Sequence, residues 1–81
     1  MIKRSKWEIT YAILKSIQNG EKSKTRIMYE AYLDWRNFSR YIKFLIDKNL
    51  VVEKNGGKLE ITQKGEKILK IMEELIELIK D

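Results

Sequence analysis

The sequence predicts an α+β fold that is mostly α-helical: a winged helix-turn-helix with three helices, a two-stranded wing and a long C-terminal helix. Three observations support this prediction. A β-hairpin pattern surrounds Asn55-Gly56-Gly57, a short helix, a turn and a longer helix precede it, and a long segment with helical apolar spacing follows it. This order of elements is typical of the winged helix-turn-helix.

The wing is predicted from two short runs of alternating apolar and polar residues, at 50–54 and 58–61. Between the runs, Asn55-Gly56-Gly57 supplies residues that readily adopt the positive φ angles of a tight turn. Thr62 then provides an N-cap for the final helix. A third strand between the first two helices has little support in the sequence.

The first helix is predicted to begin at a capping box formed by Ser5 and Glu8 and to end near residue 19, where Gly20 stops it. Its apolar residues spread over roughly 200° of the helix circumference, wider than the stripe of about 100° that a surface helix needs. Part of this face is therefore available to something beyond the local core.

A helix-turn-helix is predicted next. A short helix at about 25–31 is followed by a turn at 32–33, and Asp34 is a good N-cap for a helix at about 35–48 with Asn49 as its C-cap. One face of this third helix is apolar at helical spacing: Phe38, Tyr41, Ile42, Leu45 and Ile46. We expect Trp35, beside the N-cap, to pack in the core rather than on a nucleic-acid backbone.

Composition excludes several classes of function. The 81-residue chain has no Cys and no His, so disulfides, thiolate metal sites and the commonest general base are absent. Gly56-Gly57 belongs to a turn and not to a nucleotide-binding loop. We therefore expect no enzyme activity, no metal and no cofactor. The N-terminus lacks the apolar run of a signal peptide, and no segment is long enough to span a membrane.

Charge is unevenly distributed along the chain. The net charge is +5, but residues 1–58 hold thirteen Lys/Arg and six Asp/Glu, whereas residues 59–81 hold four Lys/Arg and six Asp/Glu. A basic body with a mildly acidic C-terminal segment fits a polyanionic partner such as nucleic acid. Solubility alone is the alternative explanation.

The third helix is the main candidate for contact with duplex DNA. With the apolar face inward, Arg36, Arg40 and Lys43 lie on the opposite face, and Asn37 and Ser39 lie at its edges. Such side chains can reach base edges in a major groove. Asp47 on the same face predicts that the far end of the helix leaves the groove. A solvated charged face is the alternative.

Flanking basic residues would frame the same surface. Lys54 and Lys58 bracket the tip of the wing, and Lys24 and Arg26 open the second helix, whose N-terminal amides favour a phosphate. Lys beside a hairpin is also routine protection of a sheet edge. A further pair near the N-terminus, Lys3 and Arg4, is a candidate phosphate-binding arm.

The final helix carries a wide apolar stripe. A heptad-like seam and its neighbours make up a predicted dimer interface: Ile68, Ile71, Met72, Leu75, Ile76, Leu78 and Ile79. The stripe covers about 180° and extends beyond the small body, so a second copy in antiparallel contact is the simplest partner. Full burial against the wide face of the first helix is the alternative.

Three segments, KRSKWEITYAILKSIQNG, KTRIMYEAYLDWRNFSRYIKFLIDKNLV and ITQKGEKIL, resemble the small archaeal winged-helix proteins of the Sulfolobus ten-kilodalton "a" chromatin-associated family, with relatives among viral and plasmid regulators. The resemblance implies DNA binding and a dimer formed through a C-terminal antiparallel coiled coil. It matches Arg40 and Lys43 to the family's basic pair, and Lys24 and Arg26 to its second-helix entry. The final helix is shorter here, since the chain ends at Asp81.

The combined expectation is a homodimeric, sequence-specific protein that binds double-stranded DNA as a transcriptional regulator. Residues 1–65 would form the DNA-binding domain, and 66–81 a dimerisation helix continuous with it. An architectural chromatin protein with little sequence preference and a winged-helix module for protein–protein interaction are the alternatives. The expected partners are duplex DNA and a second copy, without a membrane, in the cytoplasm and associated with the nucleoid.

Overall fold

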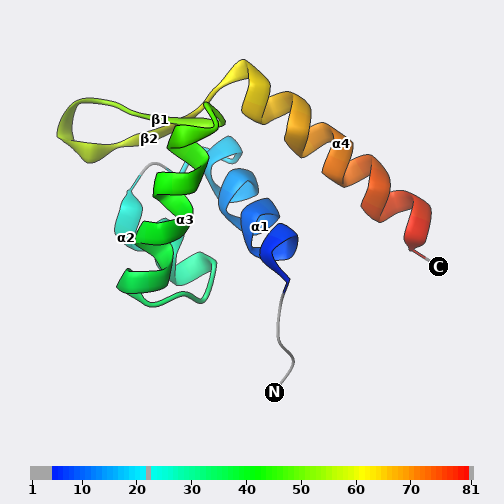
Figure 1. The fold of residues 1–81 in the computed structure, drawn as a ribbon, viewed down its shortest axis with the longest axis horizontal. Helices are drawn as coiled ribbons and strands as arrows, with labels where there is room; N and C mark the ends of the chain where they lie inside the picture. Colours follow the sequence, from blue (N-terminus) through cyan, green and yellow to red (C-terminus); the bar gives the residue numbers. More distant parts are fainter. Residues whose placement is uncertain (1–4, 22, 81) are drawn as a thin grey trace.

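The computed structural model describes residues 5–21 and 23–80. The predicted contacts Lys3 and Arg4 lie outside the described residues. The elements, in chain order, are α1 (Lys6–Gln18), α2 (Lys24–Glu30), α3 (Trp35–Asp47), β1 (Val51–Glu53), the 3-10 turn η1 (Asn55–Gly57), β2 (Leu59–Ile61) and α4 (Gln63–Ile79). The α+β, mostly helical winged helix-turn-helix predicted from the sequence is confirmed, and the two strands form the only sheet in the described chain (Figure 1).

Each of the four α-helices begins at a side chain that accepts a hydrogen bond from a backbone amide of the first turn. Ser5 forms the predicted capping box with Glu8, and Asp34 and Thr62 cap α3 and α4 as expected. Ser23 caps α2, and this cap was missed. The second helix therefore begins one residue earlier than predicted.

The first three helices end in the same way. The residue after each C-cap has a positive φ: 103° at Gly20, 56° at Tyr32 and 62° at Asn49. In each case this residue donates its amide to a carbonyl three residues back, and the next residue donates to a carbonyl five residues back. This is the Schellman motif, and it sets the short connection between α2 and α3.

The wing is a short antiparallel hairpin in which Val52 lies opposite Glu60. Its tip differs from the prediction: positive φ falls on Gly56 and Gly57, at 78° and 76°, and not on Asn55. The Gly57 amide donates to the Lys54 carbonyl at 3.0 Å, which closes a single 3-10 turn. The turn lies at the predicted three residues, and each strand is shorter than expected.

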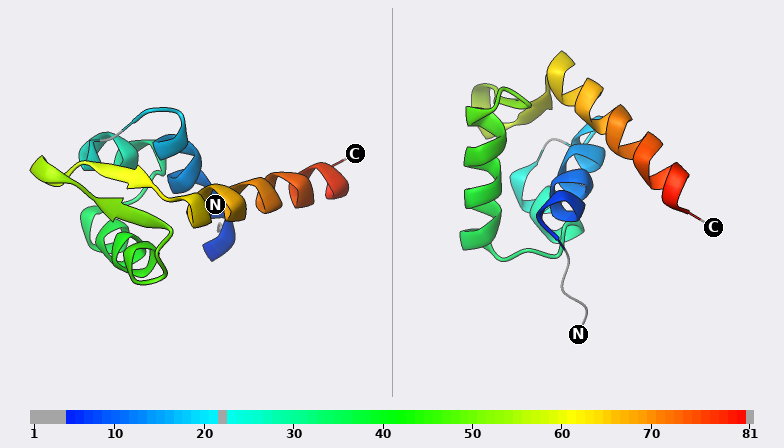
Figure 2. Two further views of the ribbon diagram at one scale, coloured as in Figure 1. Left: turned by 90° about the horizontal axis from the view of Figure 1, so that it is seen from above. Right: turned by 45° about the vertical axis from the view of Figure 1, so that its right-hand side comes forward.

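The core lies where α1, α2, α3 and the hairpin meet. In two views α1 lies between α3 and α4 (Figures 1 and 2). The buried apolar residues come from every helix and both strands: Ile13, Leu14, Ile17, Ile27, Ala31, Phe38, Ile42, Leu45, Leu50, Val51, Leu59 and Leu69. The α3 face predicted from helical spacing supplies three of them.

The start of α4 is held close to the loop between α3 and β1. A Cβ on Gly65 would lie 2.2 Å from the Leu50 carbonyl oxygen, so only glycine allows this approach. Only Gly65 and Leu69 of α4 are buried. The distal part of α4 leaves the body (Figure 2), and a pair of contacts holds its middle to α1: Glu73 accepts from Lys15 Nζ at 2.7 Å and from the Tyr11 hydroxyl at 3.5 Å.

The distal apolar residues of α4 remain largely uncovered. Ile71 is 60 % exposed and Leu78 is 83 % exposed, with Leu75 and Ile79 also exposed. Full burial of α4 against α1, the alternative considered from the sequence, is therefore wrong. None of the helices in the described part of the chain combines the length and the apolar character that crossing a membrane requires.

Candidate nucleic-acid interface

The outward face of α3 carries the polar and basic residues predicted to contact DNA. All five are exposed: Arg36, Asn37, Ser39, Arg40 and Lys43. Phe38, Ile42 and Leu45 are buried on the opposite face and fix the rotation of the helix about its axis. The Asp34 cap and the preceding Schellman turn fix its starting point, so these side chains project from a rigid support.

A shallow groove of about 270 Å³ separates α3 from α2 and the base of the wing. Ser39 and Lys43 of α3 line it, together with Asp47, Lys24 and Glu53. Lys24 Nζ donates to the Glu53 carboxylate at 3.0 Å, which ties α2 to β1. The structure thus gives Lys24 a protein partner at the position where a phosphate was predicted.

Arg26 also has a partner, since its Nε lies 3.1 Å from the Glu21 carboxylate. Its side chain remains 73 % exposed, so the pair lies in solvent and is weak. Lys54 and Lys58 are both exposed on either side of the turn at the tip of the wing. All four basic residues, Lys24, Arg26, Lys54 and Lys58, lie outside α3.

Trp35 is less buried than expected. Its ring packs against Phe38 with centroids 5.9 Å apart, yet the residue remains 57 % exposed. The prediction of core packing was therefore wrong, because the first turn of α3 extends past the edge of the small core. Tyr29 and Tyr32 of the helix-turn-helix are exposed as well.

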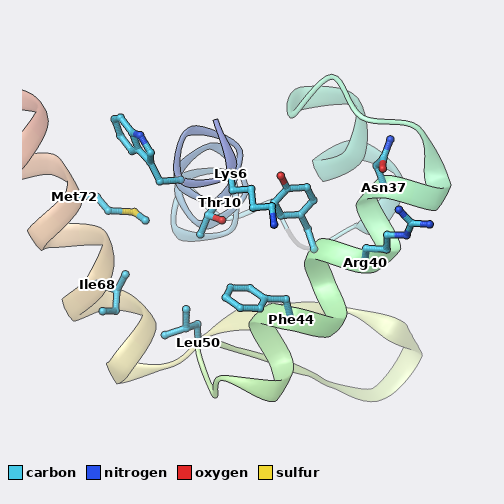
Figure 3. A pocket seen from close by; sticks show the side chains of 10 residues that line it. Lys6, Thr10, Asn37, Arg40, Phe44, Leu50, Ile68 and Met72 are labelled. Carbon is cyan, nitrogen blue, oxygen red and sulfur yellow. The ribbon is translucent and has the colours of Figure 1, made fainter. Parts of the chain in front are cut away.

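A second, larger groove of about 640 Å³ lies between α1, α3 and α4. Figure 3 shows Phe44 and Leu50 on one side of it and Ile68 and Met72 on the other. Its lining is Lys6, Trp7, Thr10, Asn37, Arg40, Tyr41, Phe44, Leu50, Ile68 and Met72. Sequence reasoning did not predict this groove. The one signal for it was the unusually wide apolar face of the first helix, which includes Trp7.

The predicted dimer residues divide into two groups around α4. Ile68, Met72 and Ile76 are half-buried on the side toward the body, whereas the other four are exposed: Ile71, Leu75, Leu78 and Ile79.

The hydrogen bond from Lys15 to Glu73 raises the pKa of the Lys15 ammonium above its ordinary value. Among the described residues, no cluster of three or more carboxylates is placed to hold a metal ion.

The family model that matches residues 3–80 describes a winged helix-turn-helix. An uncharacterised protein of Methanocaldococcus jannaschii is 51 % identical over 77 residues, which is 95 % of this chain and 78 % of the relative. A second uncharacterised protein of the same archaeon is 45 % identical over 78 residues, and this chain spans 36 % of its length.

Two solved structures share the fold. Sso10a-2, a DNA-binding protein from Sulfolobus solfataricus, has a TM-score of 0.76 and 28 % identity over 93 % of this chain and 81 % of that one. A protein of unknown function from Listeria innocua has a TM-score of 0.77 and 23 % identity over 86 % of this chain and 52 % of that one. The resemblance to the archaeal Sulfolobus proteins is thereby confirmed, and the chain belongs to the winged helix-turn-helix family.

Proposed function

We propose that the protein binds double-stranded DNA as a homodimer and acts as a sequence-specific transcriptional regulator. The observation that carries the proposal is the exposed polar face of α3 directly after the helix-turn-helix turn, with Arg36, Asn37 and Arg40 in its first turns. The likeness to Sso10a-2, which is a DNA-binding protein, supports it. The fold belongs to a class of binding domains and not of enzymes.

In this proposal the N-terminal half of α3 enters the major groove. Arg40 and Arg36 can each present two N–H groups to O6 and N7 of guanine, and Asn37 can pair with adenine in a similar way. Lys54 and Lys58 at the wing tip meet phosphates or a minor groove, which raises affinity without reading sequence. Asp47 disfavours contact with phosphate at the far end of α3.

The dimer is proposed to form through the exposed side of α4. In an antiparallel pair, Ile68 lies opposite Leu78 and Ile71 lies opposite Leu75, and both pairings are centred on the same point of the helix. The same register brings Lys67 and Lys70 of one copy near Glu74 and Glu77 of the other. One pairing therefore satisfies both the apolar residues and the charges.

Dimerisation would strengthen DNA binding by linking two DNA-binding domains. Once one domain is bound, the second binds at a high effective concentration, so the dimer binds more tightly than either domain alone. A twofold dimer also predicts a site with two inverted half-sites. We place this activity in the cytoplasm, on the nucleoid.

The test is selection of binding sites from random duplex DNA at one fixed salt concentration. We expect enrichment of an inverted repeat that is bound about 10³-fold or more tightly than random duplex. Binding with little preference among sequences would instead favour an architectural chromatin protein. Failure to bind any duplex at low salt would reject the proposal and favour a module for protein–protein interaction.

A further inference from the structure

The groove between α1, α3 and α4 has the size and lining of a small-molecule site. Its volume of about 640 Å³ falls within the roughly 300–1,000 Å³ of typical ligand pockets. Three aromatic rings line it, from Trp7, Tyr41 and Phe44. The Phe44 and Trp7 side chains remain 48 % and 40 % exposed, so a flat apolar molecule would cover surface that this chain leaves in water.

The charged residues of the groove are all of one sign. Lys6 and Arg40 line it, and the lining includes no Asp or Glu. The groove beside the wing differs, since Lys24 and Lys43 are balanced there by Asp47 and Glu53. Lys6 reaches from α1 into the space before α3, whereas the Arg40 guanidinium points away from the space between α1 and α4 (Figure 3). Of these two lining residues Lys6 therefore reaches into the groove, and a third cation, the Lys48 ammonium, lies 6.0 Å from the centroid of the Phe44 ring.

The groove is also distinct from the proposed dimer seam on the same helix. Met72 lies roughly 80° around α4 from the centre of the seam at Ile68, Ile71, Leu75 and Leu78, at 100° per residue. Met72 is half-buried and lines the groove, while Ile71 is 60 % exposed and does not line it. A partner helix on the seam would leave Trp7 and Phe44 accessible.

We propose that this groove binds a small aromatic organic anion, such as an aromatic carboxylate or sulfonate, and that the ligand controls DNA binding. The rings of Trp7 and Phe44 hold the flat body of the ligand, and the Lys6 ammonium holds its anionic group. Because Asn37 and Arg40 form the rim on α3, the bound anion draws the Arg40 charge away from a duplex. This regulatory part rests on the proposed function, whereas ligand binding itself does not.

The probe is 8-anilinonaphthalene-1-sulfonate, and its matched control is N-phenyl-1-naphthylamine, which has the same rings without the sulfonate. Quenching of Trp7 emission in the Trp35→Phe protein reports on the groove directly. We expect one sulfonate probe per protomer, with Lys6→Gln weakening it by about tenfold or more, since a charge-assisted hydrogen bond is lost. Binding of the uncharged probe should stay the same.

Three further variants locate the site. Met72→Trp fills the groove and Phe44→Ser removes one wall; because Phe44 is a surface residue, the second variant tests the groove even where the first fails to fold. Binding to these variants is read from the emission of the bound probe, since Met72→Trp adds a second tryptophan. Both should weaken both probes, whereas Tyr29→Ser, an exposed aromatic residue of α2 outside the groove lining, should weaken neither. Unchanged binding in the two groove variants, loss in Tyr29→Ser, or no binding by the parent protein would each overturn the proposal.

The coupling between probe binding and DNA binding is measured with the duplex obtained by binding-site selection. Saturating sulfonate probe should weaken duplex affinity by at least about fivefold, and duplex should weaken the probe by the same factor. Tight duplex binding that the bound probe leaves unchanged would reject the control of DNA binding. Absence of duplex binding at every salt concentration would reject the proposed function instead, while the probe titrations would still decide whether the groove is a ligand site.

Discussion

Arg40 belongs to two surfaces at once. It is exposed on the outward face of α3, and it also forms the rim of the groove between α1, α3 and α4. The backbone beneath it is held by Phe38 and Ile42, which are buried one turn apart. The Arg40 side chain can therefore change partner without changing the fold, which separates its contribution to binding from any contribution to stability.

Arg40→Ala should cost about 1–3 kcal/mol of binding free energy on a preferred site and relax the choice of base there. The melting temperature should stay the same, because the side chain is exposed. Competition titrations against substituted duplexes give the measurement. Lys54→Ala is the control, since it should weaken all sequences alike. Parent-like affinity and specificity in Arg40→Ala would remove Arg40 from the interface.

Gly65 is a second position where a single residue decides the packing, here because it has no side chain. Gly65→Ala would place a Cβ 2.2 Å from the Leu50 carbonyl oxygen, and backbone cannot rotate away as a side chain can. We expect a loss of about 1–3 kcal/mol in unfolding free energy, although alanine is the better helix former. Urea denaturation would measure it. The control is Gln63→Ala, an exposed position in the same turn, which should change stability little.

Among the elements, local sequence predicted most of the helix boundaries. Ser5, Asp34 and Thr62 each accept a hydrogen bond from the amide three residues further on, so their effect is visible without tertiary structure. The direction of α4 and the groove beside it could not be predicted in this way. They depend on Gly65 meeting the Leu50 backbone, a contact between parts of the chain that the apolar pattern does not relate.

The same distinction explains the outcome for Trp35 and Lys24. Helical spacing placed Phe38 and Ile42 correctly in the core, but it carries no information on where a small core ends, and Trp35 lies past that edge. The Lys24–Glu53 pair joins residues 29 positions apart, so no partner for Lys24 could be recognised from neighbouring residues. Side chains facing inward were therefore predictable, while the partners of surface charges were not.

The contact between α1 and α4 predicts a pH dependence. The pKa of Lys15 is raised above 10.5 by its hydrogen bond to Glu73. The contribution of the Lys15–Glu73 contact to stability is therefore fully present below pH 10.5. It is lost as the pH rises through the pKa that Lys15 has in the folded protein. The melting temperature of Glu73→Gln should consequently differ from the parent at neutral pH and converge on it in strong alkali. A constant difference across this range would contradict the assignment.

For the whole molecule, dimerisation is the property that we expect to affect duplex binding most. Leu78→Glu places a charge at one end of the proposed seam, opposite Ile68, and an unpaired charge against apolar surface is costly. We expect a monomer and much weaker duplex binding, with light scattering giving the mass. Gln63→Glu adds the same charge to α4 outside the seam and should remain dimeric. A parent protein that is monomeric at micromolar concentration would reject the dimer.

Binding by the whole dimer should also depend strongly on salt. With about three phosphate contacts per subunit, the log–log slope of affinity against salt should be near −5. Titration of one duplex at increasing salt measures the slope. A flat response would mean that the basic surface around α3 and the wing does not meet the phosphate backbone.

The pairing of Lys24 with Glu53 gives this titration a further meaning. A phosphate that takes Lys24 leaves the Glu53 carboxylate beside the DNA, where it attracts a cation from solution and offsets one of those released. The salt slope therefore corresponds to fewer cations released than there are lysines and arginines in contact with phosphate. In Glu53→Gln no cation is retained in this way, so its slope should be steeper than that of the parent by up to about one unit.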